Sequence, residues 1–136
     1  RAKELGYPSP IQPDKASTDK DYDAALDFIV ANKDIFSVCA GTHNEKSSMY
    51  LATLLHQDQV EPNDPKFYFA QLLGMSDHIS YNLSDAGYQV AKYVPFGPVN
   101  EVLPYLLRRA DENTSVAGQT SRELGLLMKE KARRAN

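Results

Sequence analysis

The chain has 136 residues, of which 42% are hydrophobic and 24% charged, a composition typical of one compact globular domain. Its formal net charge of −3 argues against the broad basic surface that nucleic acid selects, so we expect no nucleic-acid partner. No apolar run approaches the roughly 20 residues that a membrane span needs. The single cysteine, Cys39, lies in an apolar run and is interpreted as a small buried hydrophobic residue.

The first predicted elements are an amphipathic helix and a short strand. The helix is expected to begin at Thr18, a candidate N-cap with Asp21 three residues later, and to end near Asn32. The β-branched and aromatic run over 35–41 is too short for a helix and predicts a strand.

The same order, strand followed by helix, repeats along the chain. Asn44 is expected to cap a second helix, and the run 67–73 predicts a second strand after a proline-containing loop. A short helix follows, which Gly87 is suited to end in a left-handed conformation. A third strand is expected over 89–94, and Pro98 favours the first turn of the next helix.

Two helices complete the prediction, separated by a break over 114–118, with the last helix over about 121–134. Strands that alternate with helices are typical of an α/β fold with a parallel sheet. Three parallel strands alone would leave the faces of the sheet uncovered and its edges unpaired. Because a (β/α)8 TIM-type barrel takes about 250 residues, the chain has the length of roughly half a barrel.

In such barrels the active site lies at the carboxyl ends of the strands, so the residues there are candidates for function. His43 follows the first strand and could be a base, a metal ligand or a cofactor contact, or a capping residue without a chemical role. No second histidine or carboxylate lies at ligand spacing, which argues against a metal. His56 and His78 have no identifiable partner and are interpreted as surface residues.

An arginine pair in the helix predicted to follow Pro98 is the sharpest local feature. Tyr105 lies one helical turn before Arg108 and Arg109, so the three side chains can approach a common point. Adjacent guanidinium groups repel each other, and each fits carboxylate or phosphate oxygens in a bidentate manner. The alternative is that they are solvated or pair with nearby acids, namely Glu101, Asp111 and Glu112.

Four motifs resemble the proline dehydrogenase family in order and spacing: AGTHN at 40–44, YFAQLLGM at 68–75, KYVPFGP at 92–98 and EVLPYLLRR at 101–109. The resemblance implies a distorted barrel with FAD at the strand ends and oxidation of L-proline to Δ1-pyrroline-5-carboxylate. Residues 1–136 would be the C-terminal half of that barrel domain, about the last four βα units plus a C-terminal helix.

The same resemblance implies roles for seven residues. Arg108 and Arg109 would bind the proline carboxylate. The substrate pocket would be walled by Tyr105, Tyr93 and Leu72, and FAD would be contacted by Thr42 and His43. It assigns no catalytic residue to this chain, because the flavin performs the hydride chemistry. A tyrosine at 105 favours proline over hydroxyproline.

The resemblance also implies partners outside the chain. The family's pocket lysine and aspartate, and most flavin contacts, come from earlier strands, so the N-terminal half of the barrel is an expected partner. The isolated chain is not expected to oxidise proline. Segment 7–11 would be the remains of a further strand, and Lys15 in the loop after it would approach the cofactor phosphates. A membrane quinone would reoxidise the flavin, in the bacterial cytoplasm or at the inner membrane, or in the mitochondrion of a eukaryote.

Two other functions stay open at this point. The chain could be a non-catalytic half-barrel that self-associates or binds a protein through its sheet edge. It could also belong to a different barrel enzyme that uses the arginine pair for a phosphate.

Overall fold

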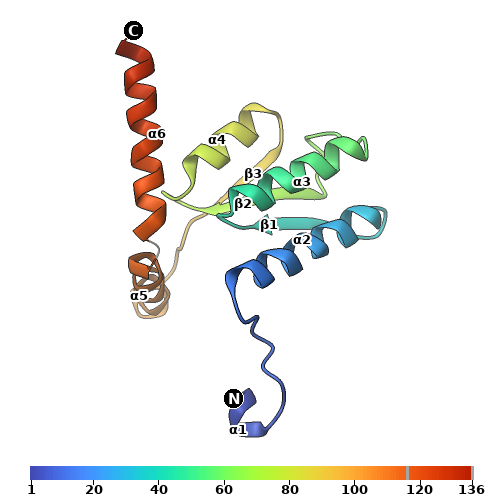
Figure 1. Ribbon diagram of the computed structural model, residues 1–136, viewed down its shortest axis with the longest axis vertical. Coiled ribbons are helices and arrows are strands. Elements are labelled where there is room, and N and C mark those ends of the chain that lie inside the picture. The colour runs from blue at the N-terminus through green and yellow to red at the C-terminus, as the bar shows by residue number, and fades with distance from the viewer. Residues whose placement is uncertain (116, 136) are drawn as a thin grey trace. The chain divides into compact units, whose positions relative to one another are not determined.

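The computed structural model describes residues 1–115 and 117–135, with side chains over 1–110 and 124–135. It divides into two compact units, Arg1–Val94 and Pro95–Asn136. The elements, shown in Figure 1, are α1 (Ala2–Leu5), α2 (Lys15–Ala31), β1 (Val38–Gly41), α3 (Glu45–Gln57), β2 (Phe67–Leu72), α4 (Asp77–Asp85), β3 (Gln89–Tyr93), α5 (Val99–Ser115) and α6 (Ala117–Ala135).

The first unit is built on a parallel sheet in the order β1-β2-β3. The α/β fold predicted from the alternating pattern is therefore confirmed, and the second and third strands match their predicted ranges to within one residue. The first strand is shorter than predicted, because Ile35 and Phe36 precede it and are exposed. In the register, Ala40 lies opposite Phe69, which in turn lies opposite Val90.

The core of this unit lies on one face of the sheet. Phe67 and Phe69 of the central strand are 1% and 0% exposed and pack with apolar residues of α2, α3 and α4. Helices α2 and α3 lie side by side (Figure 1). The alternate residues of β2 point to the opposite face, because successive side chains of a strand alternate. These are only half-buried: Tyr68, Ala70 and Leu72.

Helix α2 begins four residues earlier than predicted, when its N-cap is compared with the predicted one at Thr18. Asp14 is its N-cap, in an extended conformation, and its carboxylate accepts a hydrogen bond of 2.7 Å from the backbone N–H of Ser17. That bond holds the pKa of Asp14 below its ordinary value. Thr18 lies inside the first turn and donates its hydroxyl to the carbonyl of Asp14, so the predicted cap at Thr18 is wrong. Asn32 ends the helix as expected.

Helix α3 starts as predicted. Asn44 is its N-cap, and its side-chain oxygen accepts a 3.0 Å hydrogen bond from the N–H of Lys46. We expect Asn44→Ala to lower the free energy of unfolding by about 1 kcal/mol, because this N–H loses its acceptor. Asn44→Asp keeps an acceptor, so its free energy of unfolding should stay close to that of the parent protein. Chemical denaturation of both variants measures the difference, and equal losses would show that the cap does not matter.

Three further predictions for this unit are wrong. Cys39 is exposed rather than buried, because it points to the face opposite the buried Ala40. Segment 7–11 forms no strand, and Ile11 is 81% exposed. Two of its five residues are prolines, which cannot donate to a ladder of hydrogen bonds. Lys15 is the first residue of α2 rather than a loop residue, and it forms an ion pair with Asp19.

The second unit consists of α5 and α6. As predicted, Pro98 lies at the start of α5, where its carbonyl accepts the N–H groups of Glu101 and Val102 at 3.0 Å each. The predicted break over 114–118 is narrower, since helical backbone reaches Ser115 and resumes at Ala117, while residue 116 lies outside the described residues. Within the described part of the chain, no helix is long and apolar enough to cross a bilayer.

The end of α6 carries basic residues. Arg133 and Arg134 lie in its last turn, where cations interact favourably with the helix dipole. Both donate hydrogen bonds to Glu130, and these bonds lower the pKa of Glu130 to about 2. Both arginine side chains are largely exposed and Glu130 is partly exposed, so this cluster belongs to the surface of the helix.

Candidate functional site

The carboxyl ends of the three strands lie along one edge of the sheet, because the strands are parallel. Thr42 and His43 directly follow β1. Leu72 ends β2, lies opposite Tyr93 of β3 and is half-buried. The N–H of Leu73 donates to the carbonyl of Tyr93 at 3.0 Å. The structure thus brings four of the predicted site residues to the same edge.

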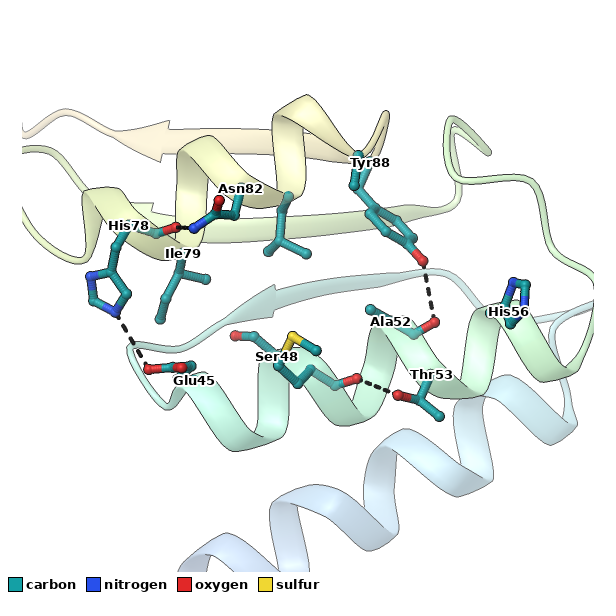
Figure 2. Close-up of a pocket in the computed structure, with 12 residues that line it drawn as sticks. Glu45, Ser48, Ala52, Thr53, His56, His78, Ile79, Asn82 and Tyr88 are labelled. Atoms are coloured by element: carbon teal, nitrogen blue, oxygen red, sulfur yellow. Dashed lines mark hydrogen bonds and ion pairs between the residues drawn. The ribbon is translucent and has the colours of Figure 1, made fainter. Parts of the chain in front are cut away.

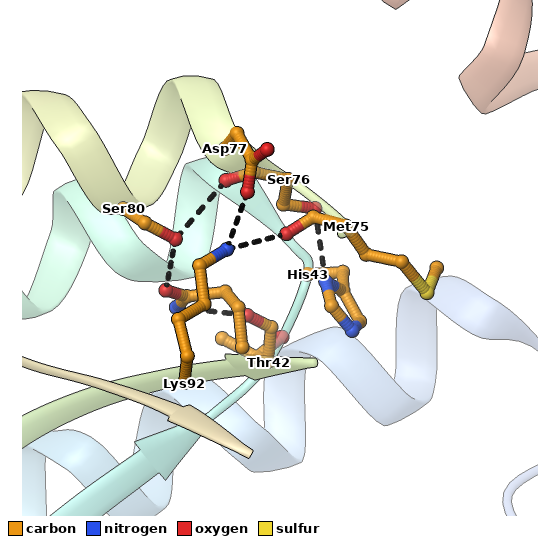
Figure 3. A network of polar contacts seen from close by, with 8 residues as sticks. Thr42, His43, Met75, Ser76, Asp77, Ser80 and Lys92 are labelled. Atoms are coloured by element: carbon orange, nitrogen blue, oxygen red, sulfur yellow. Dashed lines mark hydrogen bonds and ion pairs between the residues drawn. The ribbon is translucent and has the colours of Figure 1, made fainter. Parts of the chain in front are cut away.

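His43 is held at this edge by a serine from the next loop. Its Nδ1 lies 2.9 Å from the hydroxyl oxygen of Ser76, which precedes α4 (Figure 3). Ser76 is only 1% exposed and has φ 52° and ψ 40°, the left-handed conformation. For a residue other than glycine this backbone costs on the order of 1 kcal/mol or more. The surrounding contacts must therefore stabilise it.

Gln71 connects the end of β2 to its neighbours on both sides. Its Nε2 donates to the carbonyl of Thr42 at 3.3 Å, and its Oε1 accepts from the hydroxyl of Ser80 at 2.9 Å (Figure 3). Gln71 and Ser80 are both 3% exposed. A buried amide with both ends bonded avoids the cost of unsatisfied polar groups, so it fixes the spacing between β1, β2 and α4.

Lys92 of β3 binds the connection between β2 and α4. Its ammonium group lies 2.8 Å from the carbonyl oxygen of Met75 and 2.8 Å from the carboxylate of Asp77 (Figure 3). Its side chain is 22% exposed, so this ion pair is partly shielded from water. The loop between β2 and α4 is therefore bonded to residues from all three strand ends.

Sequence reasoning named none of these connecting residues as functional. Gln71, Ser76, Ser80 and Lys92 form the network, and only two of them carried a usable signal. Gln71 and Lys92 are polar residues inside otherwise apolar strands, and polar residues in such positions need bonded partners. Nothing in the local sequence distinguishes Ser76 or Ser80 from other serines.

The arginine pair lies in α5, in the second unit. The guanidinium carbon of Arg109 lies 5.3 Å from the centroid of the Tyr105 ring, a cation–π distance. These two side chains are half-buried, whereas Arg108 is exposed. Of the predicted approach of three side chains, the part between Tyr105 and Arg109 is thus confirmed, and the part of Arg108 stays a prediction. The meeting of the arginines with the strand ends stays a prediction.

A cavity of about 380 Å³ lies elsewhere, between α3 and α4 (Figure 2). At one end, Nε2 of His78 lies 3.6 Å from the carboxylate of Glu45, and His56 lies toward the other end. His78 therefore has a partner, which corrects its interpretation as a plain surface residue. None of the seven predicted site residues lines this cavity. Over the described residues, no group of three or more His, Cys, Asp or Glu side chains could hold a metal.

Comparison with known proteins agrees with the resemblance seen in the motifs. Proline dehydrogenase 1, mitochondrial, of Homo sapiens is 44% identical over 137 residues, which cover 98% of this chain and 23% of the human protein. The hydroxyproline dehydrogenase of Xenopus laevis is 40% identical and is covered over 29% of its length. The chain thus spans less than a third of these curated relatives.

A solved structure shares the fold. It is the crystal structure of proline utilization A (PutA) from Bdellovibrio bacteriovorus inactivated by N-propargylglycine. The TM-score is 0.75 at 26% identity, and the match covers 85% of this chain and 12% of that one. The family model described as proline dehydrogenase matches residues 1–122. Because that match includes both the strand-end residues and the arginine pair, the chain belongs to the proline dehydrogenase family.

Proposed function

We propose that this chain forms the C-terminal half of the active site of an FAD-dependent dehydrogenase that oxidises L-proline to Δ1-pyrroline-5-carboxylate. The observation that carries the proposal is the family match over residues 1–122. The relatives' names support the reaction, and the Xenopus laevis relative is a reason to test hydroxyproline beside proline.

The proposed architecture is part of a (β/α)8 barrel, comprising about its last four βα units and a C-terminal helix. The parallel order β1-β2-β3 supports it, as does the packing of α2, α3 and α4 on one face of the sheet. In a barrel the strands form the inner layer and the helices the outer ring. The half-buried face of β2 would then point inward, and the missing strands are expected from the N-terminal half of the barrel.

The strand ends fit an FAD site in this chain. Thr42 and His43 are half-buried polar residues at the edge where barrel enzymes bind their ligands. Beside them, Leu72 and Tyr93 offer apolar surface of the kind that a flat ring system covers. Thr42 and His43 would hold the cofactor, and the bound flavin would accept the hydride from the proline carbon next to nitrogen.

Arg108 and Arg109 would hold the substrate by its carboxylate, since a guanidinium group binds both oxygens of a carboxylate. Tyr105 supports this role, because its ring lies against the Arg109 guanidinium and restricts its orientation. Together with Tyr93 and Leu72, Tyr105 would wall the pocket and exclude water. Fixing the carboxylate would position the ring of proline for transfer, and holding reacting groups in the right geometry lowers the barrier of a reaction.

The remaining partners follow from the same proposal. A membrane quinone would accept the electrons from the reduced flavin. A mitochondrial location is the better supported of the two predicted locations, because several relatives carry that word in their names. No nucleic-acid partner is proposed.

The test is spectroscopic and uses the complete protein that carries this chain. We expect it to bind FAD and to lose the oxidised-flavin absorbance when L-proline is added without oxygen. A proline analogue with the same carboxylate should protect it against thermal unfolding. A colourless, well-folded oligomer would favour the non-catalytic module, and protection by phosphate alone would favour a phosphate-binding enzyme.

A further inference from the structure

Ser76 combines three features that its local sequence does not explain. It is 1% exposed, its backbone is left-handed at φ 52°, and its hydroxyl lies 2.9 Å from Nδ1 of His43, 33 residues away. Its side chain makes no hydrogen bond that caps α4, although it occupies the N-cap position. The hydroxyl is therefore directed at the histidine of the neighbouring strand end rather than at its own helix.

The contacts around Ser76 hold it in this unfavourable conformation. Its carbonyl accepts the hydroxyl of Ser80 at 3.3 Å as well as the N–H groups of Ile79 and Ser80. On either side of it, Lys92 binds the Met75 carbonyl and the Asp77 carboxylate, both at 2.8 Å. Residues in left-handed backbone that persist because their surroundings hold them are often found at functional sites.

The geometry points to Ser76 as a positioning residue, which orients His43 for contact with the cofactor and does not itself touch the substrate. A hydrogen bond at one ring nitrogen of a histidine fixes both the ring rotation and the tautomer. When the serine hydroxyl donates to Nδ1, the ring proton is on Nε2, which then acts as a donor. FAD carries many oxygen acceptors in its ribityl, ribose and pyrophosphate groups, so a donor at Nε2 suits it. The inference rests on the proposed function, because it assumes that His43 contacts FAD.

The decisive variant is Ser76→Gly in the complete protein that carries this chain. Glycine adopts left-handed backbone without steric cost, so the loop can keep its path while the hydroxyl is lost. We expect the dissociation constant of FAD to rise about three- to tenfold, the range that one net hydrogen bond supports. The KM for proline, measured at saturating FAD, should not change, and the apoprotein should melt at the same temperature or higher.

A double-mutant cycle with His43→Phe separates positioning from a general loss of structure. If Ser76 acts through His43, adding Ser76→Gly to His43→Phe should not weaken FAD binding further. Ser48→Ala serves as the matched control, because it removes the hydroxyl of another buried serine, 2% exposed on α3 and outside the network around Ser76. It should leave the FAD dissociation constant unchanged.

The outcomes are distinguishable. If the parent protein binds no FAD, the proposed function fails and the role of Ser76 fails with it. If the parent binds FAD and His43→Phe weakens binding while Ser76→Gly does not, the positioning role alone is wrong. Additive effects of the two substitutions would also overturn it, because they would show that Ser76 acts independently of His43.

Discussion

Replacing Arg109 by alanine should raise the KM for proline roughly 10- to 100-fold while FAD remains bound, because a hydrogen-bonded charge contributes about 1.5 to 3 kcal/mol. The guanidinium group would lose its carboxylate contact, and Tyr105 would lose the cation that lies over its ring. Steady-state kinetics with proline, together with the flavin content of the purified protein, measures both effects. The same change at Arg108 should act in the same direction.

Two controls sharpen this prediction. Arg133→Ala removes an exposed arginine that binds Glu130 in α6, so it should leave the KM for proline unchanged. Arg109→Lys keeps the charge but loses the planar fork, and we expect it to restore only part of the affinity. An unchanged KM in both Arg108→Ala and Arg109→Ala would refute the assignment of the arginine pair to the substrate carboxylate.

Phe69→Ala should destabilise the protein by about 3 to 5 kcal/mol, the range measured when a buried aromatic side chain is deleted. Phe69 is 0% exposed on the central strand, and its ring meets Tyr88 edge-on at a centroid distance of 5.4 Å. The deletion leaves a cavity where β2 meets α3 and α4. Denaturant unfolding of the complete protein, with helix content as the monitored signal, measures this loss of stability.

Phe28→Ala is the matched control for this change. Phe28 lies on α2, is 60% exposed and touches Phe36 at a centroid distance of 5.6 Å. Because Phe28 is already largely exposed, its deletion removes little buried apolar contact. The loss in the free energy of unfolding should therefore stay near the roughly 0.5 kcal/mol typical of surface sites. Similar losses for the two variants would mean that Phe69 does not lie in the core described above.

Elements supported by several local signals were predicted well. The strand over 67–72 combines aromatic residues with a bounding proline loop, and α3 has both a cap at Asn44 and leucines at helical spacing. Such signals act within one turn or one strand, so they remain valid whatever the rest of the chain does. The predicted N-cap of α2 was wrong because Asp14 and Thr18 are both suitable caps and lie only one turn apart.

Burial at strand positions was harder to predict from sequence. Cys39 sits in an apolar run, yet it is exposed, because the face to which it points depends on the register of β1 against β2. A shift by one residue would reverse that face. Segment 7–11 was mistaken for a strand because a strand also needs a neighbour to pair with, and no local pattern provides one.

From α2 onward, the sequence alone determined the order of strands and helices, and it determined the parallel α/β class and the motifs at 40–44, 68–75, 92–98 and 101–109 that point to the family. Only the tertiary structure decided that Ser76 contacts His43 across 33 residues and that Lys92 contacts Met75 across 17. The physical reason is that local periodicity and capping depend on residues within a few positions. Contacts at the strand ends depend on how parallel strands align, and this alignment is set by packing of the whole sheet.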